Sequence, residues 1–242
     1  LPDAINSFIN DRNIFNIRKI QSDIYDYYGD GASKYDKDHK LKIKRIYDLI
    51  PSNLEDKKKR VVVKNIENIK GKRFSNYQDE FDYLINSGIA LEVKAISTSV
   101  FPLIESSEKN LLKLYLNDAG LLSNILYKTN IKAILNDEKS INLGTVYESV
   151  VASELKAHGH NLFYYDNKAN GEVDFLIDDY DTLSFLPLEI KSGKNYTIHS
   201  AINKFLSNKS YNVKQGIVLS NEQKIFEKNN ILYLPIYFVM FL

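Results

Sequence analysis

The chain has 242 residues, and its 32 basic and 31 acidic residues give a net charge of +1 at neutral pH. An apolar content of 44% supports one large core or two small ones, and 26% charged residues are typical of a soluble protein. The sequence contains no cysteine, which excludes disulfides and thiolate zinc sites and fits a reducing, cytoplasmic location. No signal peptide opens the chain, and its longest apolar run, residues 231–242, is too short to span a bilayer.

Helices are predicted over the first fifty residues, because apolar residues recur there at helical spacing. Gly29 and Gly31 are expected to end the first pattern, and Pro51 the second. The two patterns consist of Ile5, Phe8, Ile9, Ile17, Ile20, Ile24 and Tyr28, and then of Leu41, Ile43, Ile46, Leu49 and Ile50.

A short strand at 61–63, a helix that stops at Gly88 and a strand at 89–97 follow. Helices followed by a β-ribbon are the order of elements in a winged-helix unit. Such a unit binds DNA in some proteins and protein in others. We therefore expect residues 1–110 to form a helical, winged-helix-like domain.

Basic residues are concentrated in the first half of the chain. Residues 37–73 contain 13 basic and 5 acidic residues, and the centre of this stretch is Lys57, Lys58, Lys59 and Arg60. Such a stretch can follow a phosphate backbone. The alternative is a solvated face in a lysine-rich protein.

The second half predicts a mixed α/β layer, with a sheet flanked by helices over residues 111–242. The expected elements are a strand at 113–116, a helix beginning near Asp118, a helix at 145–158, strands at 162–165 and 172–177, a strand around Glu189, a helix at 198–206 and a strand at 216–219.

Two of these strands place carboxylates among apolar residues. If their turn centres on Asp181 and Thr182, Asp174 and Glu189 lie directly opposite each other, with Cβ atoms about 4.5–5.5 Å apart. Lys191 follows Glu189 by two positions and shares its face. Two such carboxylates repel unless a cation lies between them, and Mg²⁺ or Mn²⁺ prefers oxygen ligands.

The Glu-x-Lys pattern is common by chance, so an ordinary cross-strand ion pair is the alternative. In that reading Lys191 pairs with Glu172, which the same register places opposite it. The pattern occurs five times in the chain, at Glu55/Lys57, Glu92/Lys94, Glu154/Lys156, Glu189/Lys191 and Glu222/Lys224.

Glu148 is a third carboxylate to consider, in the first turn of the helix predicted at 145–158. It could turn toward the sheet and complete a metal site. Alternatively, Thr145-x-x-Glu148 is a capping box, in which the glutamate binds backbone N–H groups at the helix start.

Glu148, Asp174 and the run Glu189–Ile190–Lys191 together resemble the PD-(D/E)xK nuclease superfamily, with Val173 in the place of the proline of its name. Longer matches at 43–51, 113–122, 144–156 and 188–193 resemble the carboxy-terminal region of a prokaryotic AAA-type ATPase family. That region is an uncharacterised nuclease-like domain behind a winged helix, and the resemblance covers roughly residues 40–220.

The resemblance implies that Asp174, Glu189, the Ile190 carbonyl and Glu148 hold Mg²⁺ or Mn²⁺. It implies further that Lys191 positions or deprotonates the attacking water. Family members carry a nucleotide-binding domain upstream, and no phosphate-binding Gly-x-x-x-x-Gly-Lys loop occurs here, so ATP is expected only through that domain.

We therefore expect a nucleic-acid-associated module of an AAA-type ATPase with a Mg²⁺-dependent phosphodiesterase site. The alternative is a non-catalytic regulatory or protein-interaction module of the ATPase. The expected partners are DNA and the upstream ATPase domain, with homo-oligomerisation as a further option and no membrane. Since the sequence begins at Leu1 and stops within an apolar run, we expect a fragment of a longer protein.

Overall fold

The structure is a computed structural model that describes residues 2–35, 39–128, 130–136, 143–167, 171–193, 196–197, 200–211 and 213–242. The chain forms two compact units that interleave in sequence. The first unit consists of Leu1–Leu91 and Leu114–Ser149, and the second of Glu92–Lys113 and Val150–Leu242. Within the described residues, no helix is long and apolar enough to cross a membrane.

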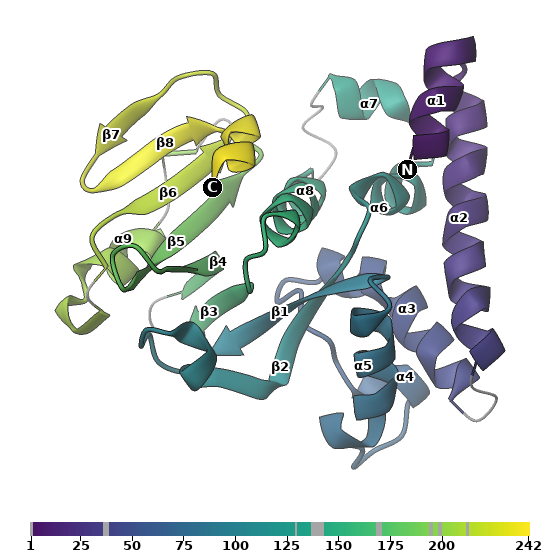
Figure 1. The fold of residues 1–242 in the computed structure, drawn as a ribbon, viewed down its shortest axis with the longest axis horizontal. Coiled ribbons are helices and arrows are strands. Elements are labelled where there is room, and N and C mark those ends of the chain that lie inside the picture. The colour runs from purple at the N-terminus through teal and green to yellow at the C-terminus, as the bar shows by residue number, and fades with distance from the viewer. Residues whose placement is uncertain are drawn as a thin grey trace. The chain divides into compact units, whose positions relative to one another are not determined.

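The first unit is mainly helical (Figure 1). Its core centres on one face of α3, where Ile43, Tyr47, Ile50 and Leu54 are almost completely buried at spacings of three and four residues. The ring of Tyr47 stacks on that of Tyr25 with centroids 4.6 Å apart. The helices are α1 (Pro2–Asp11), α2 (Ile14–Tyr35), α3 (Lys40–Glu55), α4 (Lys64–Glu67), α5 (Gln78–Asn86), α6 (Ala119–Tyr127) and α7 (Ile131–Leu135).

Two predicted helix ends are wrong. Helix α2 continues through Gly29 and Gly31, and α3 continues through Pro51. A Cβ added at Gly29 would lie 3.5 Å from the Tyr47 ring, which is an ordinary contact distance, so Gly29 lies where α2 packs on α3. Pro51 is buried in the core of the unit. Tertiary packing therefore offsets the local preference of both residue types to end a helix.

The strand predicted at 61–63 is also wrong, because Val61–Val63 form irregular backbone before α4. The predicted order of a helix and then a β-ribbon does occur, as α5 leads into β1 (Ala90–Ile96) and β2 (Ser107–Leu116). The N–H of Ser97 donates to Ser106 near one end, and the N–H of Asn117 donates to Ile89 near the other, so the two strands run antiparallel.

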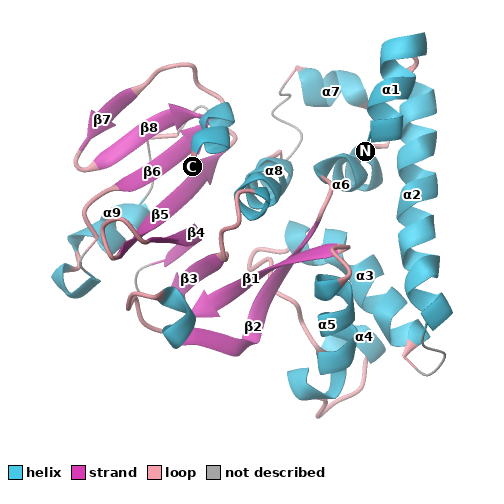
Figure 2. Ribbon diagram, viewed as in Figure 1, coloured by secondary structure: helices cyan, strands magenta, loops and turns pink. Residues whose placement is uncertain are grey.

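The described residues form a mixed sheet of eight strands in the order β2-β1-β3-β4-β5-β6-β8-β7, which confirms the predicted α/β class (Figure 2). The pairs β1–β3, β5–β6 and β6–β8 are parallel, and β3–β4, β4–β5 and β7–β8 are antiparallel. The remaining strands are β3 (Phe163–Asn167), β4 (Gly171–Asp179), β5 (Ser184–Lys191), β6 (Gly216–Ser220), β7 (Phe226–Lys228) and β8 (Ile231–Pro235).

Helix α9 (Ser200–Ser207) connects β5 to β6 and contributes to the core of the second unit. Phe205 of this helix packs on Tyr165 and Phe185 in one cluster, and Ile202 packs with Val218 in another. The parallel β5–β6 pair with a helical connection is the expected α/β arrangement. The helix was predicted from residue 198, and residues 198 and 199 lie outside the described residues.

Strands β7 and β8 were not predicted, although they extend the sheet beyond β6. The boundary predicted at residue 110 falls within β2. Residues 107–113 of that strand belong to the second unit, and the strand then returns the chain to the first unit. The two units are therefore linked by continuous strands, which a search for a polar linker cannot detect.

Helix α8 (Gly144–Ala157) matches the helix predicted at 145–158. Its end is a Schellman motif, in which the N–H of His160 donates to Leu155 and the N–H of Gly159 to Lys156. Gly159 has φ of +90°, a backbone conformation that favours glycine.

The surroundings of Gly31 and Gly216 predict that replacing each with alanine changes the free energy of unfolding in opposite directions. A Cβ at Gly31, inside α2, would meet nothing within 4 Å, so Gly31→Ala should raise the free energy of unfolding by about 0.5–1 kcal/mol. A Cβ at Gly216 would lie 2.8 Å from the buried Ile202, so Gly216→Ala should lower it by about 1–3 kcal/mol. Urea denaturation measures both, and equal effects of the same sign would contradict this packing.

Candidate functional site

The hairpin of β4 and β5 has the predicted register. Phe175 pairs with Leu188, and the pairing continues without a shift to Asp179 and Ser184. The same register places Asp174 and Glu189 opposite each other, one residue beyond the Phe175–Leu188 pair. The turn is held by Asp179, whose carboxylate accepts bonds from the N–H and hydroxyl groups of Thr182, and these bonds lower its pKa.

Strand β4 contains one extra residue where it pairs with β3. Phe163 opposes Leu176 and Tyr165 opposes Val173, so two steps along β3 correspond to three along β4. Asp174 and Phe175 of β4 together lie opposite the single residue Tyr164 of β3. Such a bulge interrupts the strict alternation of side chains and re-aims one of them. Asp174 therefore lies where the direction of the β4 side chains is set by a local irregularity.

Asp174 is bound to the neighbouring strand through its side chain, because its Oδ2 accepts a hydrogen bond of 2.8 Å from the N–H of Ile190. The N–H and C=O of one strand residue point to the same edge, so the Ile190 carbonyl also faces the β4 edge. Glu189 is buried, with 5% of its surface exposed, and its Oε1 lies 2.6 Å from the Lys191 ammonium. The hairpin thus brings Asp174, Glu189 and Lys191 to the same end of the β4–β5 pair.

Glu148 belongs to the first unit, and the other three predicted catalytic residues belong to the second. The carboxylate of Glu148 is buried and forms an ion pair with the Lys59 ammonium. Its other oxygen accepts a hydrogen bond of 3.0 Å from the hydroxyl of Tyr115. Glu148 is therefore a buried acid that a lysine and a tyrosine hold.

The capping-box alternative for Glu148 does not agree with the start of α8. The helix begins at Gly144, so Thr145 is already inside it. The hydroxyl of Thr145 is buried and donates to the carbonyl of Leu54 in α3. Thr145 therefore fixes the helix to the core of the first unit and is not its N-cap residue.

The predicted nucleic-acid-binding residues lie in the loop after α3 and differ in exposure. Lys57 and Lys58 are exposed, whereas Lys59 and Arg60 are partly buried. Lys59 has φ of +50° and directs its ammonium to Glu148. The two exposed lysines are thus the members of the group that a phosphate backbone could reach without a rearrangement.

A completely buried lysine lies on strand β2, within the second unit. Lys113 of β2 is completely buried, forms an ion pair with Glu172 and lies 4.6 Å from the centre of the Tyr164 ring. Glu172 is thus paired with Lys113, and Lys191 with Glu189. Neither Lys113 nor Tyr115 was predicted, although a lysine within the apolar run 111–116 was a visible signal.

The donor set of the hairpin fits a hard divalent cation, since two carboxylates and a strand carbonyl supply only oxygen ligands. Within the described residues, no group of three or more His, Cys, Asp or Glu side chains is close enough to hold a metal ion. A cation at Asp174 and Glu189 would therefore keep several water ligands, as Mg²⁺ commonly does.

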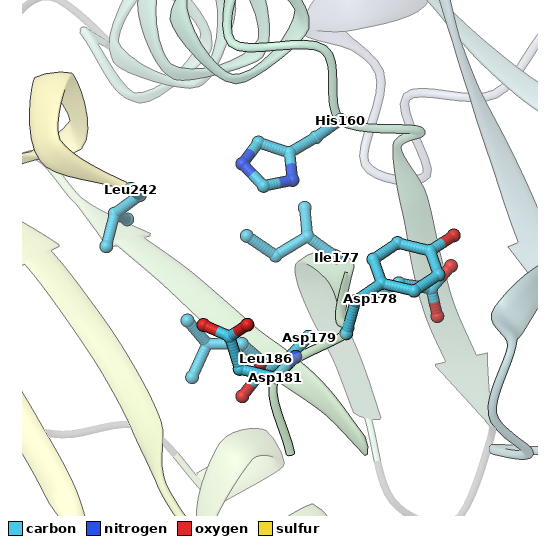
Figure 3. Close-up of a pocket in the computed structure, with 8 residues that line it drawn as sticks. His160, Ile177, Asp178, Asp179, Asp181, Leu186 and Leu242 are labelled. Atoms are coloured by element: carbon cyan, nitrogen blue, oxygen red, sulfur yellow. Dashed lines mark hydrogen bonds between the residues drawn. The ribbon is translucent and has the colours of Figure 1, made fainter. Parts of the chain in front are cut away.

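A cavity of about 310 Å³ lies at the turn end of the same hairpin (Figure 3). Figure 3 shows the ring of His160 on one side of this hollow and Asp181 on the other, with Ile177 between them. Burial raises the pKa of Asp178, whose carboxylate accepts a hydrogen bond from the N–H of Leu103. The lining includes neither Asp174 nor Glu189, so this cavity is separate from the candidate site.

Two protein families match the chain. The family described as "Domain of unknown function (DUF8612)" matches residues 1–132, and "Domain of unknown function (DUF4143)" matches residues 143–239. The DUF4143 domain is found in prokaryotic proteins associated with AAA-type ATPases. No curated protein and no solved structure matches the chain. The second match contains Glu148, Asp174, Glu189 and Lys191, and the first contains the basic loop.

Loss of the Glu172 carboxylate should destabilise the protein, because it leaves the buried Lys113 ammonium without its counter-ion. We expect Glu172→Gln to lower the free energy of unfolding by about 3 kcal/mol. The control is Glu92→Gln, which removes the partly exposed Glu92–Lys94 pair of 3.0 Å and should cost less than about 1 kcal/mol. Urea denaturation measures both, and equal costs would contradict the difference in burial.

Proposed function

We propose that this chain, which belongs to the family described as "Domain of unknown function (DUF8612)", is a nucleic-acid-associated module with a Mg²⁺-dependent phosphodiesterase site. The site consists of Asp174, Glu189 and Lys191. The observation that carries the proposal is the register of β4 and β5, which brings two carboxylates and an ammonium to one end of a hairpin.

Three further features support the proposal. The bulge at Asp174 is of the kind that often accompanies functional side chains. Glu189 is a buried carboxylate at the end of a strand, a costly placement unless a cation or hydrogen bonds compensate for it. The DUF4143 match spans all three residues, and its association with AAA-type ATPases makes an ATPase domain of the same polypeptide the expected partner.

The chemistry follows from the residues. Asp174, Glu189 and the Ile190 carbonyl, all in the second unit, would hold Mg²⁺. The bound ion would polarise the scissile phosphate and lower the pKa of a coordinated water. Lys191 would orient that water or take its proton, and its charge would offset the negative charge that develops on the phosphate. The Asp174–Ile190 bond would keep the Asp174 carboxylate in place.

DNA is the proposed nucleic acid. The helical, winged-helix-like part of the chain, with Lys57 and Lys58 exposed in the loop after α3, would contact the phosphate backbone. Lys59 and Arg60 would join them only if Lys59 left Glu148.

A second function, in which the same module binds or regulates without cleavage, is favoured by one observation. Glu148 is held by Lys59 and Tyr115, and Glu189 is bound to Lys191, so these acids already have cationic or hydroxyl partners. Carboxylates whose charge is already balanced by such partners can stabilise the fold without binding a metal ion.

Calorimetric titration with Mn²⁺ separates the two functions. The proposed site should bind one Mn²⁺ per chain, and Asp174→Asn or Glu189→Gln should each weaken binding at least about tenfold, because each removes one of the few charged ligands. Lys191→Met should leave Mn²⁺ bound and lower the rate of DNA hydrolysis about 100-fold or more.

Glu92→Gln is the matched control, since Glu92 is also the first residue of a Glu-x-Lys run on a strand and pairs with its own lysine. It should change neither metal binding nor hydrolysis. Metal binding that survives both carboxylate substitutions would refute the site. Metal binding without hydrolysis in any variant would leave the regulatory function as the correct one.

The salt dependence of DNA binding tests the role of the basic loop. The slope of log K against log salt should become shallower by about 2 in the double variant Lys57→Gln/Lys58→Gln, because each lysine that contacts a phosphate contributes about 0.9. Lys156→Gln/Lys214→Gln removes two exposed lysines of the second unit and is the control. Equal slopes for the parent and the loop variant would show that the loop does not contact DNA.

A further inference from the structure

A second cavity, of about 500 Å³, lies in the first unit between α2 and α6. This volume is in the range of small-molecule sites. The side chains that line it come from the first four turns of α2, from the end of α6 and from Lys128 directly after it. All of them fall within the DUF8612 match, and none belongs to the candidate phosphodiesterase site.

The guanidinium of Arg18 is fixed in this cavity but only partly used. Its Nη1 donates to the side-chain oxygens of Gln21 at 3.0 Å and Ser123 at 2.9 Å. Among the described residues, its Nε and Nη2 groups make no hydrogen bond, and no carboxylate forms an ion pair with it. An arginine offers five N–H donors in a planar fork, and a partly buried one normally meets an acid. Three donors of Arg18 are therefore left for a ligand.

The wall that holds Arg18 is preorganised. Buried Asn124 of α6 donates to the backbone carbonyl of Arg18 at 3.2 Å and to the hydroxyl of Ser22 at 2.9 Å. Ser123 in turn donates to the carbonyl of Gly120 within its own helix. These bonds tie α2 to α6 at Arg18 and one helical turn later at Ser22, so they hold the arginine in place without a ligand.

The charge of the lining favours an anion. Among the described residues that line the cavity, Arg18, Lys19 and Lys128 contribute three positive charges, and Asp26 is the one acidic residue. Burial lowers the pKa of Arg18. An anion that entered the cavity would supply the missing counter-charge.

Aromatic side chains border the same space. Tyr25 lines the cavity with one face of its ring already stacked on Tyr47. Phe15 also lines it and is 69% exposed, so its ring is accessible to a ligand. The combination of a cationic fork with exposed aromatic surface is typical of sites for phosphorylated molecules that carry an aromatic group.

We propose that the cavity between α2 and α6 binds a small phosphorylated ligand of the nucleoside phosphate class, with Arg18 as the residue that recognises the phosphate. Lys19 and Lys128 supplement the charge at the rim, and Phe15 contacts the aromatic portion. The proposal is independent of the phosphodiesterase site.

Calorimetric titration of the full chain with adenosine monophosphate, inorganic phosphate and adenosine tests this site. Adenosine monophosphate should bind saturably and more tightly than phosphate, and adenosine should bind weakest. Arg18→Gln should weaken binding of the monophosphate at least about tenfold, and Arg18→Lys should restore only part of it, because lysine lacks the planar fork. Arg12→Gln, which removes an exposed arginine outside the cavity, should have no effect.

Lys19→Gln/Lys128→Gln gives a second test that does not touch the packed wall, and it should weaken binding several-fold with an unchanged melting temperature. The proposal is overturned if neither phosphorylated probe binds, or if binding is the same in the Arg18→Gln protein. Arg18-dependent binding of an oligonucleotide, with no binding of the monophosphate, would also overturn it by assigning the residue to a nucleic-acid surface.

Discussion

The antiparallel pairing of β4 with β5 is the constraint on which the candidate site depends. Its register aligns Asp174 with Glu189, and the bond from the Ile190 N–H to Asp174 replaces a backbone contact with a side-chain contact at the end of the ladder. A slip of one residue would move every β5 side chain to the opposite face. The turn at Asp179 and Thr182 therefore acts on the site from the far end of the hairpin.

Buried lysine–carboxylate pairs are the second recurring element. Lys59 with Glu148 in the first unit and Lys113 with Glu172 in the second each place an ammonium on a mainly buried acid. Each pair also has an aromatic neighbour, Tyr115 for Glu148 and Tyr164 for Lys113. Such pairs are costly to break, so both carboxylates are held firmly in the absence of a metal ion.

The parts that the sequence could predict depend on local rules. The hairpin follows from a short turn, and the alternation of side chains places Glu189 and Lys191 together. Gly29 and Pro51 do not end their helices, because the packing of α2 on α3 outweighs their local preference. Pairing between residues far apart in sequence has no local signal. Lys113 and Glu172 are separated by 59 residues, and Arg18 and Ser123 by 105, so neither contact could be foreseen.

The central claim is that Asp174 and Glu189 hold a divalent cation, and anomalous diffraction from crystals grown with Mn²⁺ tests it most directly. One anomalous peak is expected about 2.1–2.3 Å from oxygens of both carboxylates, with the Lys191 ammonium displaced from Glu189. If millimolar Mn²⁺ leaves this position without a peak while Lys191 remains bound to Glu189, these carboxylates do not hold the cation.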